Sequence, residues 1–370
     1  MSIAVVHDWL NGMRGGEKVL EEILRLYPDS TIYTLFHERG MVSPFIESHR
    51  IVTSWLDRVP GVYKRYRSLL PLFPAAVQSW NLEHFGLVIS SSHAAAKGVR
   101  CGKTVHVCYC HTPMRYVWDA EDDYRIGRLR RAALATVRSR LQRWDCEAAQ
   151  GVSHFVSNSG FVRDRIRLYY GRDAEVIHPP VDTDFYSLAP ACREDFYLAA
   201  GALVPYKRLD LVVDAFNKLD RRLIIAGSGP ESARLRRMAG PNIEFRGWVS
   251  NEELRNLYRS ARALVFAARE DFGIVTVEAR ACGCPVIAFG AGGSSETVQD
   301  GVNGIVFPEQ APGDVIRAVR LFETLTWPAD RVRFGVERFS REVFRSKFGE
   351  FVAGRTRPPR KPRELETQPA

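Results

Sequence analysis

Two glutamates, Glu270 and Glu278, enclose the segment of this sequence with the clearest capacity for chemistry. An apolar run at residues 264–267 precedes the pair, and the helical pattern that contains Glu278 begins beside Gly273. A glycine lets backbone approach a ligand closely, and the first turn of a helix offers unpaired N–H groups at its positive dipole end. The segment is therefore a place for a diphosphate. Glu278, about one turn into the helix, can accept hydrogen bonds from two ribose hydroxyls, and Glu270 can reach a transferred sugar.

The elements that must position this segment alternate between strand and helix, which predicts an α/β fold with parallel sheets. The predicted strands are residues 3–6, 31–35, 87–90, 105–110, 155–157, 196–200, 222–226, 243–245, 263–266, 286–288 and 304–306. The predicted helices of the first half are residues 16–27 and 127–149. Two consecutive prolines, Pro179 and Pro180, forbid helix and suit a stiff link between domains.

We therefore expect two doubly wound, Rossmann-like domains that face a central cleft, with ligands bound at the carboxyl ends of the strands. The expected boundaries are residues 1–178 for the first domain, 179–352 for the second and 353–370 for a tail. We expect the last helix to pack back on the first domain. The tail is rich in arginine and proline without apolar periodicity, which predicts disorder.

The segment around Glu270 and Glu278 resembles the E-x7-E motif of family 4 retaining glycosyltransferases, which have the GT-B fold. The following Cys284-Pro285 strand and the glycine-rich loop up to Glu296 resemble the strand and loop beside the donor sugar in that family. The competing interpretation is an ordinary helix start with surface acids. The resemblance implies donor binding by Glu270, Phe272, Gly273, Ile274 and Glu278.

A second stretch, from Gly201 to Arg208, follows the first strand of the second domain, where this family carries a G-R-L-x-x-x-K-[GR] run. The resemblance implies that Lys207 faces the diphosphate and offsets the charge on the leaving group, with assistance from Arg208. The chain departs from the pattern at Ala202, where the family has arginine. Either Lys207 carries more of the task or another arginine substitutes. The alternative for Lys207 is a solvated lysine at a helix start.

In the first domain, the stretch HDWLNGMRGGEK resembles the N-terminal glycine loop of the family. Gly15 and Gly16 start a helix, so their amides can approach the phosphates from the other side of the cleft. His111 follows the strand at residues 105–110, where the resemblance places a histidine against the donor sugar, with proton transfer as a further role. The alternative is a structural loop histidine. An acceptor wall of aromatic and cationic side chains is expected from Arg115, Tyr116 and Trp118.

No metal and no cofactor are expected. Asp182 and Asp184 spell a DxD pair, but they lie beside the proline-rich link and resemble a turn of the family. The glycines Gly227 and Gly229 imitate the start of a dinucleotide fingerprint without its later positions, which disfavours a dehydrogenase.

The composition of the 370 residues, 45% hydrophobic and 26% charged, is typical of a soluble globular protein. The scattered cysteines, the lack of an apolar run long enough for a bilayer and the lack of a signal-peptide pattern predict the cytoplasm. The net charge of +9 is concentrated in Lys64–Arg67, which precedes an apolar run, and in the seven arginines between Tyr124 and Trp144. Such clusters suit nucleic acid, an anionic membrane or plain solvation. We expect the membrane, on the inner face of the plasma membrane, and no nucleic acid.

The family resemblance implies a retaining hexosyltransferase, with an acceptor-binding first domain and a nucleotide-sugar-binding second domain. The stretches HDWLNGMRGGEK and YCHTPMRYVWD most resemble bacterial polysaccharide and O-antigen mannosyltransferases, so the expected donor is GDP-mannose. The expected acceptor is a lipid-linked glycan or polysaccharide of cell-surface polysaccharide biosynthesis. The catalytic candidates are His111, Lys207 and Glu270. Two alternatives stay open: a nucleotide-sugar 2-epimerase of the same fold, and a non-catalytic nucleotide-sugar-binding protein.

Overall fold

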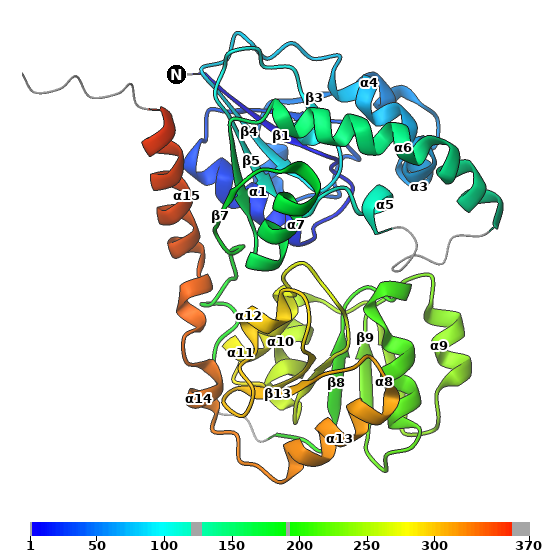
Figure 1. Ribbon diagram of the computed structural model, residues 1–370. Coiled ribbons are helices and arrows are strands. Elements are labelled where there is room, and N and C mark those ends of the chain that lie inside the picture. The colour runs from blue at the N-terminus through cyan, green and yellow to red at the C-terminus, as the bar shows by residue number, and fades with distance from the viewer. Residues whose placement is uncertain (1, 120–127, 190–192, 357–370) are drawn as a thin grey trace, which may run out of the picture.

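A computed structural model describes residues 2–119, 128–189 and 193–356, and Figure 1 shows two α/β domains, one above the other. The first domain has a seven-stranded parallel sheet and the second a six-stranded parallel sheet. In spatial order the first sheet consists of β3 (Ile51–Thr53), β2 (Thr31–Thr34), β1 (Ile3–His7), β4 (Leu87–Ser92), β5 (His106–Cys110), β6 (His154–Ser157) and β7 (Ala174–Val176). The second consists of β10 (Ile243–Gly247), β9 (Leu223–Ala226), β8 (Tyr197–Ala200), β11 (Leu264–Phe266), β12 (Val286–Phe289) and β13 (Gly304–Phe307).

The helices cover both faces of each sheet. Those of the first domain are α1 (Gly15–Leu26), α2 (Pro44–Glu47), α3 (Val62–Arg65), α4 (Phe73–Val77), α5 (Arg115–Trp118), α6 (Arg128–Gln150) and α7 (Gly160–Tyr170). The later helices are α8 (Leu209–Phe216), α9 (Ser232–Met238), α10 (Asn251–Ser260), α11 (Ile274–Ala281), α12 (Ser294–Thr297), α13 (Pro312–Glu323), α14 (Ala329–Arg333) and α15 (Arg341–Thr356). The 3₁₀ turns are η1 (Trp55–Arg58), η2 (Tyr66–Leu72), η3 (Ala96–Gly98), η4 (Pro205–Lys207) and η5 (Val336–Phe339).

The strands are apolar because both of their faces are buried. In β1, Ala4 and Val6 enter one hydrophobic cluster while Val5 enters the cluster on the opposite face. Successive side chains of a strand point to opposite faces, so a doubly covered parallel strand reads as a continuous apolar run rather than an alternating one. This is the pattern by which the central strands were predicted.

Helix α15 leaves the second domain and runs along the side of the first (Figure 1). Phe344 and Phe348, one helical turn apart, join the first-domain core and lie 5.7 and 6.1 Å from the ring of Tyr109. The helix continues past residue 353, where we expected a tail, because the buried Phe351 and Val352 still pack against this core. The remainder of the expected tail lies outside the described residues.

Within the described part of the chain, no helix combines the length and the apolar content that crossing a bilayer would require.

Candidate active site

The predicted donor-binding residues of the second domain meet at the carboxyl ends of β8, β11 and β12. Gly273 has a left-handed backbone with φ of 80°, and α11 begins directly after it. No described residue accepts a hydrogen bond from the amides of Ile274 and Val275, so the first turn of α11 presents free N–H groups. A Cβ on Gly293 would lie 2.3 Å from Cα of Phe272, so only glycine lets the loop after β12 pack against the loop before α11.

The carboxylate of Glu278 faces the first domain. Its side chain is 4% exposed, and Oε1 lies 2.9 Å from Nζ of Lys18 on α1. Its other oxygen accepts a hydrogen bond of 3.4 Å from the hydroxyl of Tyr258. Glu278 is therefore a buried acceptor directed at the boundary between the domains, and in this structure a lysine occupies it.

Lys207 lies on the turn after β8 and pairs with the carboxylate of Glu270. The pKa of Lys207 is lowered to about 7, first by burial and then by the charge of Arg115, while the charge of Asp271 opposes both effects. Arg208, next in sequence, has a left-handed φ of 51°, and its guanidinium bonds to Asp210. The two neighbouring cations therefore have different surroundings.

Phe272 and Ile274 support the loop with their side chains. The ring of Phe272 is buried and lies 5.4 Å from the ring of His178 and 5.6 Å from that of Phe339. Ile274 packs, partly buried, against the same core. What these two positions can offer a ligand is therefore backbone.

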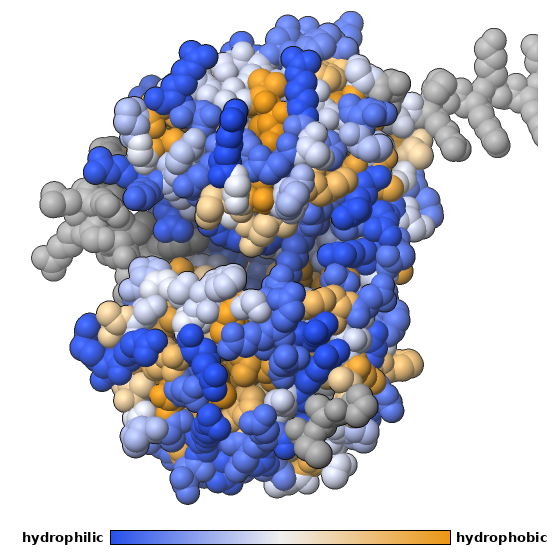
Figure 2. Space-filling view, turned by 180° about the vertical axis from the view of Figure 1, so that it is seen from behind, coloured by the Kyte–Doolittle hydropathy of each residue, from blue (hydrophilic) through white to orange (hydrophobic). Residues whose placement is uncertain are grey.

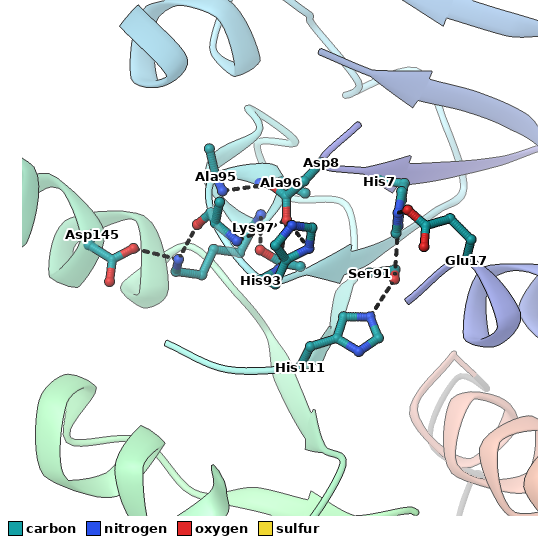
Figure 3. A network of polar contacts seen from close by, with 12 residues as sticks. His7, Asp8, Glu17, Ser91, His93, Ala95, Ala96, Lys97, His111 and Asp145 are labelled. Carbon is teal, nitrogen blue, oxygen red and sulfur yellow. Dashed lines mark hydrogen bonds and ion pairs between the residues drawn. The ribbon is translucent and has the colours of Figure 1, made fainter. Parts of the chain in front are cut away.

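His111 belongs to a polar chain in the first domain (Figure 3). The hydroxyl of Ser91 lies 2.8 Å from Nε2 of His111 and 3.1 Å from Nδ1 of His7. Glu17 lies 3.6 Å from the other nitrogen of His7. Burial lowers the pKa of His111 well below its ordinary value, with His93 and His7 adding to this, so the imidazole is neutral at physiological pH. A neutral imidazole held in this way can accept a hydrogen bond from a sugar hydroxyl.

Gly15 and Gly16 form the first turn of α1 beside this chain. A Cβ on Gly16 would lie 3.6 Å from the ring of His7 and 3.8 Å from that of His111, whereas one on Gly15 would meet open space. No described residue accepts a bond from either glycine amide. The glycine loop, His111 and Lys18 therefore share one corner of the first domain.

Asp8 fixes the turn that follows Ser91 and β4. Its buried carboxylate accepts hydrogen bonds from the amides of His93, Ala94, Ala95 and Ala96, at 2.6 to 2.9 Å. Burial raises the pKa of this carboxyl group, but His93 and the amides outweigh burial and lower the pKa overall. Asp8 is thus a structural anion that holds the polar chain in place (Figure 3).

The three predicted acceptor residues have different surroundings. Arg115 reaches the second domain, where its guanidinium lies 3.1 Å from Asp271. Tyr116 packs, partly buried, against the first-domain core. Trp118 stacks on Tyr169 with ring centroids 4.4 Å apart, and its indole N–H donates to Asp145. The structure therefore brings only Arg115 to the donor loops.

Two further contacts join the domains beside this site. Ser159, the N-cap residue of α7, donates a hydrogen bond of 2.5 Å to the carbonyl of Asp271. Glu296 of α12 accepts bonds from the amides of Gly160 and Phe161 at 3.0 and 3.1 Å, so a carboxylate of the second domain caps a helix of the first.

Sequence reasoning assigned no functional role to Lys18, Ser91, Asp271 or the Glu296 carboxylate. The signals were present for some of them: Lys18 follows the glycine pair by half a turn, and Glu296 ends the glycine-rich loop. What the chain order does not reveal is which residue each of them faces.

A cleft separates the domains, and Figure 2 shows the surface hollowed between its upper and lower halves. One part of it is a cavity of about 120 Å³, whose lining includes Lys18, Asp182 and Tyr186. Asp182 of the DxD pair accepts a bond from the amide of Phe185 and pairs with Arg341, as a turn residue does. Among the described residues, no group of three or more histidine, cysteine or acidic side chains is arranged to hold a metal ion.

Two Rossmann-like domains whose loops at the carboxyl ends of the strands face each other across a cleft define the GT-B fold. Solved structures with this architecture superpose on the whole chain. Anabaena HepE in complex with UDP covers 96% of this chain and 100% of its own with a TM-score of 0.71 at 19% identity. Sucrose-phosphate synthase from Thermosynechococcus elongatus covers 96% and 99% with a TM-score of 0.69 at 17% identity.

Family models place the chain more narrowly. The model "Glycosyltransferase Family 4" matches residues 14–185, and the model "Glycosyl transferases group 1" matches residues 182–335. The chain belongs to the family 4 glycosyltransferases of the GT-B fold. The fold class and family expected from the sequence are thus confirmed.

Curated relatives match over part of their length. A GDP-mannose-dependent alpha-(1-6)-phosphatidylinositol monomannoside mannosyltransferase of Mycobacterium tuberculosis is 32% identical over 192 residues, 44% of this chain and 50% of the relative. A D-inositol 3-phosphate glycosyltransferase of Streptomyces bingchenggensis is 32% identical over 44% of this chain and 43% of the relative. An uncharacterised glycosyltransferase of Methanocaldococcus jannaschii is 36% identical over 33% of this chain and 36% of the relative. The matched region spans half or less of each of these relatives.

Proposed function

We propose that the protein is a retaining hexosyltransferase that moves mannose from GDP-mannose onto a lipid-linked or polysaccharide acceptor. The observation that carries the proposal is the buried carboxylate of Glu278. This residue lies one turn into α11, and its side chain is directed at the first domain. A carboxylate there, beside free helix amides and a buried lysine, matches the ribose and the diphosphate of a nucleotide-sugar.

Support for the nucleotide is of two kinds. The sequence stretches before α1 and after β5 resemble bacterial mannosyltransferases, and the mycobacterial relative is GDP-mannose-dependent by name. HepE, which shares the fold at low identity, was solved with UDP and with UDP-glucose. GDP-mannose is therefore the first donor to test, and UDP-glucose the second.

The proposed step is a same-face displacement at the anomeric carbon. The acceptor hydroxyl oxygen bonds to that carbon as its bond to the diphosphate oxygen breaks, and the hydroxyl proton passes to the departing oxygen. The amides of α11 and the ammonium of Lys207 stabilise the negative charge that develops. His111 and Glu270 orient the sugar. The proposal includes no metal and no cofactor.

The test is a donor panel followed by a transfer assay. GDP-mannose should raise the melting temperature more than UDP-glucose or ADP-glucose, and radiolabelled mannose should pass to membrane-extracted lipid acceptor. Glu278→Ala and Lys207→Ala should each lower transfer by at least about 100-fold, since each removes charge-assisted contacts. Glu252→Ala, at a lining residue of the neighbouring cavity, is the control. Near-normal transfer by both site variants would overturn the assignment. Free product sugar without acceptor would indicate the epimerase, and binding without product would indicate the non-catalytic protein.

We also propose that the first domain contacts an anionic membrane. The segment from α3 to η2 exposes the cations Lys64, Arg65 and Arg67 together with Leu72, which is 41% exposed. Cations beside exposed apolar side chains suit headgroups and the acyl boundary. Co-sedimentation with phosphatidylglycerol vesicles but not with phosphatidylcholine vesicles is the expected result, and replacing the three cations by glutamine should abolish it.

A further inference from the structure

An arginine of the first domain is inserted among the donor loops of the second. Arg115 begins α5, and its side chain is 10% exposed. The guanidinium lies 3.1 Å from Oδ2 of Asp271, and its central carbon lies 5.1 Å from the ring centroid of Tyr206. Both of these neighbours belong to second-domain loops that precede α8 and α11. The side chain thus crosses the boundary between the domains at the donor site.

Lys207 also lies close to the ring of Tyr206. Its ammonium lies 5.8 Å from the centroid of Tyr206 and pairs with Glu270. Two cations, one from each domain, are therefore gathered around Tyr206, and each is paired with one of the adjacent acids Glu270 and Asp271. The two charges are close enough for Arg115 to lower the pKa of Lys207. Aromatic faces hold cations without neutralising them, which keeps both available for an anion.

Among its described residues, the second domain offers no comparable second cation at this place. Position 202, where the resemblance leads us to expect an arginine, is an exposed alanine. Arg208, which bonds to Asp210 and Gln310, has a side chain that is 34% exposed, and Arg269 is exposed, with its guanidinium over the ring of Phe161. A nucleoside diphosphate carries more than one negative charge, so one buried lysine leaves part of it unbalanced.

We propose that Arg115 is the second cation of the diphosphate site, in place of the arginine absent at position 202. When a nucleotide-sugar binds, the guanidinium exchanges the carboxylate of Asp271 for phosphate oxygens. The planar fork of an arginine matches phosphate and carboxylate geometry equally well, which permits this exchange without moving the helix. The leaving diphosphate is then held by one cation from each domain. The inference rests on the proposed function, because it concerns the same donor site.

The test compares nucleotides that differ only in phosphate number, with GDP, GMP, UDP and UMP as probes. Arg115→Met should weaken GDP or UDP binding by about 10- to 100-fold in titration calorimetry, because a charged hydrogen-bond partner is lost. Monophosphate binding should change by less than about threefold, which also reports that the variant is folded. Arg165→Met is the matched control: Arg165 is an equally buried arginine that pairs with Asp119 and lies over the rings of Phe161 and Tyr169 on its own helix. This control should leave all four affinities unchanged.

A variant that removes the charge of Asp271 should change diphosphate affinity in the opposite direction. Asp271→Asn removes the carboxylate that competes for Arg115, so at pH 6.0, below the pKa of about 7 of Lys207, diphosphate affinity should rise several-fold, and this gain should vanish when Arg115→Met is added. A structural role for Arg115 predicts no such gain. Weaker diphosphate binding by Asp271→Asn would overturn the exchange.

The experiments distinguish a failure of the Arg115 inference from a failure of the proposed donor site. If Lys207→Met loses diphosphate binding but Arg115→Met does not, the donor site stands and this inference is wrong. A variant Arg115→Met that binds GDP normally but shows a raised KM for acceptor would return Arg115 to the acceptor wall. If neither variant changes diphosphate binding, the proposed donor site itself fails.

Discussion

The protonation of Lys207 should make nucleotide binding depend on pH. The ordinary pKa of a lysine is 10.5, and burial and Arg115 lower that of Lys207 to about 7. A diphosphate binds the ammonium and not the neutral amine, so the bound form has the higher pKa. The protein alone therefore releases this proton as the pH rises through about 7, and the complex keeps it. Binding must take up a proton above pH 7, and affinity must fall as the pH rises.

The size of the effect follows from the pKa. With a pKa of about 7, half of the free protein carries the ammonium at pH 7.0 and about 3% carries it at pH 8.5. Affinity for GDP should therefore fall about 16-fold over this interval, which corresponds to ~1.6 kcal/mol. The interval lies above the second phosphate pKa of about 6, so the ligand contributes little to the change.

Titration calorimetry at pH 7.0, 7.75 and 8.5, in buffers with different heats of ionisation, measures both the affinity and the proton uptake. Uptake should rise from about half a proton to nearly one across this range. Lys207→Arg is the control, because a guanidinium stays charged throughout and should remove both effects. An affinity that is flat to pH 8.5 would refute the lowered pKa. Equal proton uptake by Lys207→Arg would show that another group titrates.

Four further substitutions test other parts of the structure. Arg208 is the only non-glycine residue in the described ranges with a left-handed φ, so Arg208→Gly should stabilise the protein by ~1 kcal/mol and raise the melting temperature by a few degrees. Gly293→Ala should destabilise by at least ~2 kcal/mol in urea unfolding, since its Cβ would lie 2.3 Å from backbone of the facing loop. Gly349→Ala in α15, whose Cβ would make ordinary contact at 3.6 Å, should instead stabilise by up to ~1 kcal/mol. Lys18→Met should tighten GDP binding about threefold, because it frees Glu278 from an ion pair whose lysine side chain is 31% exposed; unchanged or weaker affinity would show that Lys18 does not compete with the ribose.

The sheet was predictable where strands are covered on both faces. Central strands such as β9 are buried throughout and read as apolar runs. The sequence analysis missed β3 and β7, because these are three-residue edge strands that are only partly buried. An edge strand forms by pairing with a neighbouring strand that is already in place. Its own residues therefore need not form the apolar run by which a buried strand is predicted.

The site was predictable where its residues follow one another in the chain. Glu270, Gly273 and Glu278 lie on a single strand–loop–helix unit, so local physics places them together. The contact between Lys18 and Glu278 joins residues 260 positions apart and depends on how two domains dock. The same holds for Arg115, which local reasoning assigned to the acceptor and which the structure places beside Asp271.

The contacts between the domains divide into two kinds. The pairs Lys18–Glu278 and Arg115–Asp271 use the very groups that a nucleotide-sugar would need. The cap that Glu296 places on α7 uses backbone amides and no proposed ligand group. If the proposed donor site is right, a bound donor replaces the first kind of contact with its own ribose and phosphate, and leaves the second kind intact. Donor binding can then exchange partners at the centre of the boundary without separating the domains, since the cap on α7 continues to hold them together.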